Sequence, residues 1–199
     1  MMSDKGEQGM NSVNRVDRRD FIAWTEGKEP DDQGISLDKV VFLDIDGVLN
    51  DEGTNYRKGV IIDREMVKCL QTIVTETAAE IILTSSWRLD YLRFVEAGYK
   101  TTEKALIELD TALTDAGLTV RGIVPITSWS GPSSRPAEIC TWLEAIPVSK
   151  YVILDDDDFW MWEEYGLKDH LVLTKRKGSW DFIRGLKSKN VQQAIAILK

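Results

Sequence analysis

Short apolar runs alternate along the chain with longer segments in which apolar residues recur every three or four positions. A short continuous apolar run is typical of a strand buried on both faces of a parallel sheet, whereas the longer spacing is typical of an amphipathic helix. We predict strands at 39–43, 81–84, 123–126, 151–154 and 171–173. Their alternation with helices predicts an α/β fold with a doubly wound, mostly parallel five-stranded sheet and helices on both faces.

The helical segments carry recognisable ends. We predict helices at 63–74, 105–116, 136–146 and 188–198. Asp63 and Ser188 are predicted N-caps, because a short polar side chain can accept a hydrogen bond from a free backbone N–H of the first turn. Gly117 follows the second helix, where a left-handed residue commonly ends one, and Pro147 lies just past the third.

The length and the polarity of the chain predict one domain with an appendage. With 199 residues and 43% hydrophobic content the chain can bury one core. Residues 1–36 are polar apart from a few apolar positions such as Phe21 and Ile22, and we expect a partly disordered extension before a domain at 37–199. Because no apolar run reaches membrane-spanning length and the N-terminus does not resemble a secretory signal, we expect a soluble, cytoplasmic protein without a membrane partner.

Charge and cysteine content narrow the function classes. A formal net charge of −8 argues against a protein that coats nucleic acid through a general cationic surface. The segment from residue 171 to the end is rich in Lys and Arg, which we interpret as a solvated surface in preference to a phosphate-binding face. Cys69 and Cys140 lie in helical patterns without metal-ligand spacing, and we interpret them as core residues.

Polar and acidic residues follow directly after three predicted strands. The first strand ends in Asp44 and Asp46, the second in the run 84–88 (Thr-Ser-Ser-Trp-Arg), and the fourth in Asp155 and Asp156. The carboxyl ends of parallel strands lie at one edge of a sheet, so these side chains are expected to converge there. Carboxylates brought together repel one another, and a cation is therefore expected among them. An oxygen-rich set without a nearby His or Cys favours Mg²⁺, which would also let a phosphate dianion approach.

The order and spacing of these motifs resemble the haloacid dehalogenase (HAD) superfamily of phosphotransferases over residues 39–199. The segment Asp44-Ile45-Asp46-Gly47-Val48-Leu49 fits the DxDG pattern of that superfamily completely. The resemblance implies a Rossmann-like, HAD-type fold and a Mg²⁺-dependent phosphatase in which Asp44 attacks phosphorus. It also implies that Asp46 protonates the leaving group and later activates water.

The resemblance implies roles for residues after the second strand and at a later helix start. Thr84 would bind a phosphoryl oxygen, with Ser85 as a close competitor. Apart from the resemblance, we expect Arg88 to lie beside the phosphate site and to contribute to substrate binding. Arg135 stands where the family more often has Lys and would neutralise the phosphoryl oxygens in the transition state.

The implied metal site is formed by carboxylates alone. The expected ligands are Asp44, Asp46, Asp155 and Asp156. Which of Asp155 and Asp156 contacts the ion directly is left open at this point.

The segments that form a substrate-covering cap in HAD enzymes are short here, so the cap is expected to be minimal. A nearly capless site is open and suits a large substrate such as a protein side chain or a polynucleotide end. The chain also resembles the HAD domains of Swiss Army Knife RNA repair-like proteins in Gly47-Val48-Leu49-Asn50, Ser85-Ser86-Trp87-Arg88, Arg135 with Glu138-Ile139 and Trp142-Leu143, and Gly185-Leu186. The resemblance therefore implies a phosphorylated RNA or DNA end as the substrate.

Trp87 and Arg88 are compatible with a nucleic-acid substrate, since aromatic faces stack on unpaired bases. Packing in the floor of the site is an equally good interpretation of Trp87. Two other functions stay open. A small-molecule (nucleotide) phosphatase would share every catalytic residue, and a catalytically silent binding module predicts the loss of Asp44, Asp46 or the acidic pair, all of which are present.

Overall fold

The computed structural model describes residues 21–23, 35–51, 59, 61–125, 134–158, 160–175 and 185–199. The elements in these ranges follow one another in the order β1 (Leu37–Leu43), α1 (Arg64–Thr77), β2 (Glu80–Leu83), α2 (Arg88–Glu96), α3 (Lys104–Asp115), β3 (Val120–Ile123), α4 (Arg135–Ala145), β4 (Val148–Asp155), α5 (Met161–Glu164), a 3₁₀ turn (Lys168–His170), β5 (Leu171–Leu173) and α6 (Ser188–Leu198). The predicted α/β class is confirmed.

The five strands form one parallel sheet in the order β3-β2-β1-β4-β5. The central strand β1 pairs with both β2 and β4, and Leu43 stands opposite Leu83 on one side and Leu154 on the other. This register brings the carboxyl ends of the three strands level with one another. It is the arrangement that the acidic strand ends require if they are to converge.

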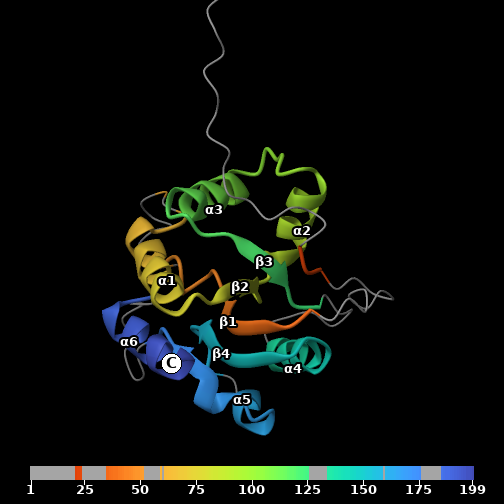
Figure 1. Ribbon diagram of the computed structural model, residues 1–199. Helices are drawn as coiled ribbons and strands as arrows, with labels where there is room; N and C mark the ends of the chain where they lie inside the picture. The colour runs from red at the N-terminus through yellow and green to blue at the C-terminus, as the bar shows by residue number, and fades with distance from the viewer. Residues whose placement is uncertain are drawn as a thin grey trace, which may run out of the picture.

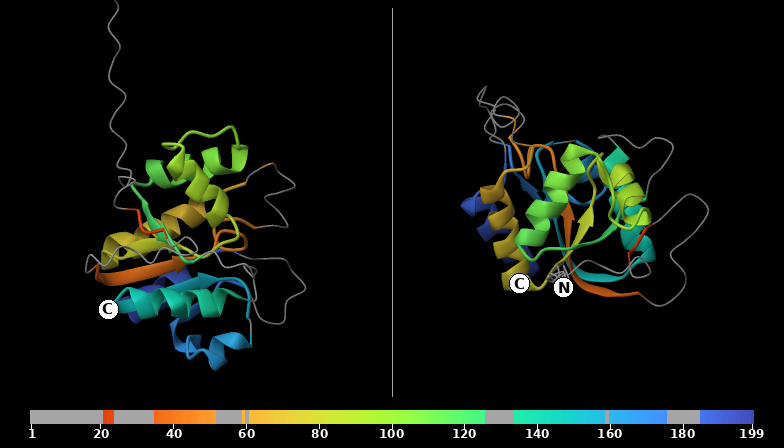
Figure 2. Two further views of the ribbon diagram at one scale, coloured as in Figure 1. Left: turned by 90° about the vertical axis from the view of Figure 1, so that its right-hand side faces the viewer. Right: turned by 90° about the horizontal axis from the view of Figure 1, so that it is seen from above.

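Both faces of the sheet are covered, as the continuous apolar runs predict. Along β1, Val41 and Leu43 belong to a core cluster formed with α1, α2, α3 and α6, whereas Val40 and Phe42 belong to a second cluster formed with α4 and α5. The alternation follows from the two-residue period of a strand. Figure 1 shows α1 and α6 on one side of the sheet and α4 on the other, and the views in Figure 2 show the same layers.

Two predicted helix ends are confirmed, and the predicted cap of the last helix is wrong. The Asp63 side chain accepts a hydrogen bond from Glu65 N at 2.9 Å and caps α1, and Gly117 has a left-handed φ of 69° after α3. Ser188 does not cap α6. The helix begins at Ser188, its N-cap is Lys187, and Asn190 supplies the cap by accepting the Lys187 backbone N–H at 3.2 Å.

The third strand begins earlier than predicted. β3 runs over Val120–Ile123, because its pairing with β2 starts at Val120 opposite Ile81. Within the predicted range 123–126, residues 124 and 125 follow the strand without belonging to it, and residue 126 lies outside the described residues. In the sequence alone, the apolar pair Ile123-Val124 was a stronger strand signal than the preceding segment, which contains Gly122.

The predicted extension contributes one described residue, Ile22, to the edge of the sheet. Ile22 forms a parallel bridge with Gly122, in which Ile22 N donates to Arg121 O and Ile123 N donates to Ile22 O, both at 2.9 Å. Phe21 and Ile22 are buried. Residues 21–23 thus pack on the edge of β3, and the domain boundary at residue 36 stays a prediction.

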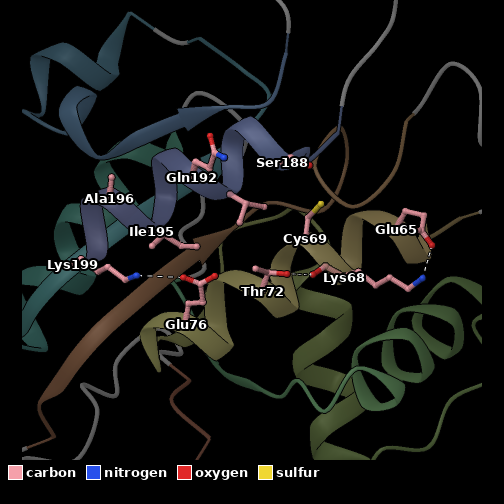
Figure 3. A pocket seen from close by; sticks show the side chains of 11 residues that line it. Glu65, Lys68, Cys69, Thr72, Glu76, Ser188, Gln192, Ile195, Ala196 and Lys199 are labelled. Atoms are coloured by element: carbon pink, nitrogen blue, oxygen red, sulfur yellow. Dashed lines mark hydrogen bonds and ion pairs between the residues drawn. The ribbon is translucent and has the colours of Figure 1, made fainter.

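One cavity lies away from the predicted site residues. A cavity of about 650 Å³ lies between α1 and α6 and is lined by side chains of those two helices, as Figure 3 shows. None of its lining residues is a predicted site residue.

Cys69 and Cys140 are free thiols. No helix of the described ranges is both long and apolar enough to span a bilayer.

Candidate active site

The predicted catalytic residues stand at the carboxyl edge of the sheet, where the strand ladder continues for one more hydrogen bond. Asp44 N donates to Leu154 O at 3.0 Å, and Thr84 N donates to Leu43 O at 2.9 Å. These bonds hold the first residue after β1 and after β2 in the geometry of the sheet. The side chains that follow the strands are therefore positioned by backbone that cannot readily move.

Three carboxylates converge at this edge. Asp44, Asp155 and Asp156 are at most 4% exposed, and each offers an oxygen within 4.8 Å of the oxygens offered by the other two. Burying three negative charges so close together is unfavourable unless cations compensate them. Carboxylate oxygens are the ligands that Mg²⁺ takes from proteins, so the set fits a Mg²⁺ ion held by these three residues.

Arg135 supplies one of the compensating charges. Its Nη1 donates to Asp44 Oδ2 at 2.9 Å and to Asp155 Oδ2 at 2.5 Å, and the residue is buried at the first position of α4. Burial lowers the pKa of Arg135, but Asp44 and Asp155 outweigh it and hold that pKa above its usual range. One guanidinium cannot neutralise three carboxylates, which leaves a net negative charge for a divalent cation.

Burial also perturbs the carboxyl groups themselves. Desolvation is the largest cause and raises the pKa of Asp44 to about 7, against the lowering influence of Arg135 and with a further raising influence of Asp155. Burial likewise raises the pKa of Asp155, again opposed by Arg135. Asp155 Oδ1 accepts the Asp157 backbone N–H at 2.9 Å, so this carboxylate is held at both oxygens.

Asp46 stands apart from the three converging carboxylates. Its Oδ1 accepts a hydrogen bond from Asn50 Nδ2 at 2.9 Å, and its Oδ2 accepts one from the indole Nε1 of Trp87 at 2.8 Å. Both oxygens are thereby oriented, which fits a group that must present a proton in a defined direction. Metal ligation by the Asp46 side chain stays a prediction, since the acidic group found among the described residues does not include it.

The two candidate phosphate hydroxyls differ in their surroundings. Ser85 makes a side-chain hydrogen bond that favours the ionised form of Asp44 and so lowers its pKa, which places its hydroxyl next to the predicted nucleophile. Thr84 is fully buried, and its Oγ1 has no hydrogen-bond partner among the described residues. A buried hydroxyl without a partner is uncommon, and a bound group is one way to satisfy it.

Arg88 lies inside the wall of the site. Its Nη2 donates to Glu138 Oε2 at 2.7 Å in an ion pair that is almost entirely buried, and its Nη1 donates to the carbonyls of Thr84 and Ser85 at 3.1 Å. The pair therefore joins the loop after β2 to the first turn of α4, which carries Arg135. The predicted contact of Arg88 with substrate stays a prediction.

Three residues that the sequence analysis did not assign to the site support it. Asn50 accepts the Gly47 N–H at 2.9 Å through Oδ1 while it donates to Asp46, Thr174 Oγ1 donates to Gly47 O at 2.8 Å, and Glu138 holds Arg88. Glu138 follows Arg135 by one helical turn, a spacing that could have indicated a shared face. Thr174 comes from the end of β5, and only the folded sheet brings it to Gly47.

Acidic residues after the first and fourth strands of a parallel, doubly wound sheet, with hydroxyl residues after the second, are the arrangement expected of HAD-type domains. The chain matches the family model described as the HAD domain in Swiss Army Knife RNA repair proteins over residues 40–189. This match covers most of the chain, and the protein belongs to that family. No curated protein and no solved structure matches the chain. Family membership supports a HAD-type phosphatase, and the buried acidic group is compatible with one.

Gly47 is required by the close approach of the first loop to Asp156. Its φ of 73° lies in the left-handed region, and a Cβ at this position would stand 2.3 Å from Asp156 Cγ. We expect Gly47→Ala to displace the Asp156 carboxylate and weaken Mg²⁺ binding at least tenfold, measured by calorimetric titration. Gly117→Ala is the matched control, because Gly117 has a φ of 69° and an added Cβ there would meet no atom within 4 Å. Equal effects of the two substitutions on Mg²⁺ affinity would attribute the loss to backbone strain alone.

Proton and metal binding should compete at Asp44. Its pKa is about 7 in the folded protein and 3.8 for an ordinary Asp, so the folded state binds more protons than the unfolded state between these values. The metal-free protein should therefore lose stability as the pH rises from about 4 to about 7. Mg²⁺ must displace the proton, and its stabilising effect should grow over the same window. Thermal unfolding with and without Mg²⁺ across this range checks both trends, and a Mg²⁺ effect independent of pH would contradict them.

Proposed function

We propose that this protein is a Mg²⁺-dependent phosphomonoester hydrolase that works through an aspartyl-phosphate on Asp44 and acts on a phosphorylated nucleic-acid end. The observation that carries the proposal is the buried cluster of Asp44, Asp155, Asp156 and Arg135, with Asp46 oriented separately beside it. In this arrangement Asp44 would act as the nucleophile, the buried charges around it would bind the phosphate, and Asp46 would serve as a separate proton donor.

In the first step, an oxygen of Asp44 attacks phosphorus and the bond to the leaving-group oxygen breaks. Asp46, in its acid form, donates a proton to that oxygen, so the leaving group departs as an alcohol. Arg135 lies within hydrogen-bond distance of Asp44 and would neutralise the phosphoryl oxygens as negative charge gathers on them. Ser85, whose hydroxyl lies next to Asp44, would donate to a phosphoryl oxygen.

In the second step, Asp46 takes a proton from a water molecule whose oxygen attacks the phosphorus of the aspartyl-phosphate. Inorganic phosphate leaves, and Asp44 and the acid form of Asp46 are regenerated. A Mg²⁺ ion held by Asp44, Asp155 and Asp156 would shield the incoming phosphate from the acidic cluster and stabilise charge on its oxygens. The hydrogen bonds from Asn50 and Trp87 keep Asp46 oriented in both steps.

The nucleic-acid end is proposed on the strength of the family, whose description names RNA repair proteins. A terminal phosphomonoester carries two negative charges at neutral pH, whereas an internal phosphodiester carries one. The buried Arg135 and a divalent cation suit the former better, because they would compensate the larger charge. The aromatic ring of Trp87 lies beside the proton donor, where a terminal nucleoside would begin.

Phosphate release from a panel of substrates tests the proposal. The panel contains an aryl phosphate, nucleoside monophosphates and oligonucleotides phosphorylated at the 3′ or the 5′ end, each assayed with Mg²⁺ and with a chelator. We expect Mg²⁺-dependent release that favours an oligonucleotide, and we expect Asp44→Asn to abolish it because the nucleophile is lost.

The exposed Asp169 provides a control, since Asp169→Asn should leave phosphate release unchanged. A fully active Asp44→Asn protein would refute the mechanism. A preference for mononucleotides would favour a small-molecule phosphatase, and the absence of release from every substrate would favour a binding module.

Arg135 provides a second test of the mechanism. We expect Arg135→Ala to lower kcat about 100-fold or more, the effect of removing one donor that stabilises developing charge. Arg135→Lys retains the charge but replaces the guanidinium, whose Nη1 reaches both carboxylates, and its activity should fall between those of the wild type and the Ala variant. Steady-state kinetics with a saturating aryl phosphate measures both, and a loss of less than threefold in Arg135→Ala would exclude a catalytic role.

A further inference from the structure

We propose that a groove between α2 and α3 is the subsite for the terminal nucleoside of the substrate. The groove has a volume of about 380 Å³ and is lined by Ser86, Trp87, Asp90, Glu103, Ala105 and Leu106. The assignment of this groove to the leaving group rests on the proposed function. Binding of a nucleoside in the groove can nevertheless be tested without turnover.

Trp87 connects this groove to the reaction centre. Its indole Nε1 donates to Asp46 Oδ2 at 2.8 Å, and the same half-buried side chain lines the groove. The proton donor must lie within hydrogen-bond distance of the leaving-group oxygen. A leaving group next to Asp46 therefore also lies next to Trp87, and the groove is the hollow into which it can extend.

The size and the lining of the groove fit a nucleoside. Its volume lies within the range of about 300–1,000 Å³ that is usual for small-molecule sites. Leu106 is buried, Ala105 is half-buried, and together with the Trp87 ring they offer apolar surface to a planar group. An indole face stacks on any base, and such stacking contributes about 1–3 kcal/mol per base.

The charged residues of the groove decide which part of a nucleotide it can hold. The charged side chains that line it, Asp90 and Glu103, are both acidic and exposed. They would repel phosphate but can accept hydrogen bonds from the exocyclic amino group of a base. The ion pair of Asp90 with Arg93, at 3.1 Å, is exposed and hence weak, so that it can yield to a ligand. We therefore assign the groove to the base and ribose, with a preference for amino-bearing bases such as cytosine over uracil.

The cavity between α1 and α6 is larger but does not suit this role. Its lining comes from α1 and α6, as Figure 3 shows, and it includes neither Asp46 nor any residue with a described contact to Asp46. A leaving group placed there would contact neither Asp46 nor the residues that hold it.

The test measures binding in the Asp44→Asn protein with Mg²⁺ present, so that no turnover occurs. Isothermal titration compares cytidine monophosphate, as the 3′ and the 5′ isomer, with ribose 5-phosphate, which lacks a base. We expect at least one cytidine isomer to bind about tenfold more tightly than ribose 5-phosphate, which corresponds to the stacking contribution. Trp87→Leu should reduce that ratio to nearly one, whereas Trp160→Leu, at a tryptophan that is 76% exposed before α5, should leave it unchanged.

A conservative variant separates the two contacts of Trp87. Trp87→Phe keeps an aromatic face but lacks the N–H that holds Asp46. We expect it to retain most of the cytidine preference in binding while lowering kcat in an otherwise wild-type protein. The double variant Asp90→Asn, Glu103→Gln keeps the shape of the groove without its charge, and the preference for cytidine over uridine monophosphate should fall to less than twofold.

The outcomes for the subsite differ from those for the proposed function. Equal affinity for ribose 5-phosphate and both cytidine isomers, or a ratio that Trp87→Leu leaves intact, would overturn the subsite even if the enzyme releases phosphate. A base-dependent ratio that depends on Trp87 would support the subsite even if no phosphate is released, in which case the proposed function fails and a nucleoside-binding site remains. If Trp87→Leu does not fold, the Asp90 and Glu103 double variant decides, and an unchanged cytidine preference would overturn the assignment.

Discussion

Three carboxylates held together at the edge of the sheet impose the main physical constraint on this protein. Asp44, Asp155 and Asp156 are buried, and each is delivered there by the end of a strand. Their mutual repulsion is partly relieved by Arg135, and the remaining charge creates a demand for a cation. The same unrelieved charge would repel a phosphate in the absence of a metal ion, so the ion would have to be in place for the phosphate to bind.

The surroundings of this cluster consist of backbone and side chains that limit its movement. The ladder bond from Asp44 N to Leu154 O fixes the nucleophile to the neighbouring strand. The buried Arg88–Glu138 pair joins the loop after β2 to the helix that carries Arg135. Such a pair contributes little net stability, because both partners lose their hydration, but removal of either would leave a buried charge beside the site. Its contribution is best understood as orientation.

Asp46 and Trp87 show how the open side of the site is organised. Asn50 and Trp87 take up one oxygen each of the Asp46 carboxylate. Trp87 was open to two interpretations in the sequence, packing or contact with a base. The structure gives it a hydrogen bond that neither interpretation included, and it also leaves part of the side chain on the groove between α2 and α3. A single residue thus links the proposed proton donor to the proposed nucleoside subsite.

The sequence by itself determined the sheet and the place of the site, because strand burial and strand ends are local signals. The run 39–43 predicted a strand buried on both faces, and Asp44, Thr84 and Asp155 were expected at the edge where they lie. Only the tertiary structure decided which side chains meet. Separations of 91 residues between Asp44 and Arg135 and of 127 between Gly47 and Thr174 leave no periodic trace in a sequence. The start of β3 and the cap of α6 were likewise set by partners, β2 and Asn190, that a local pattern does not reveal.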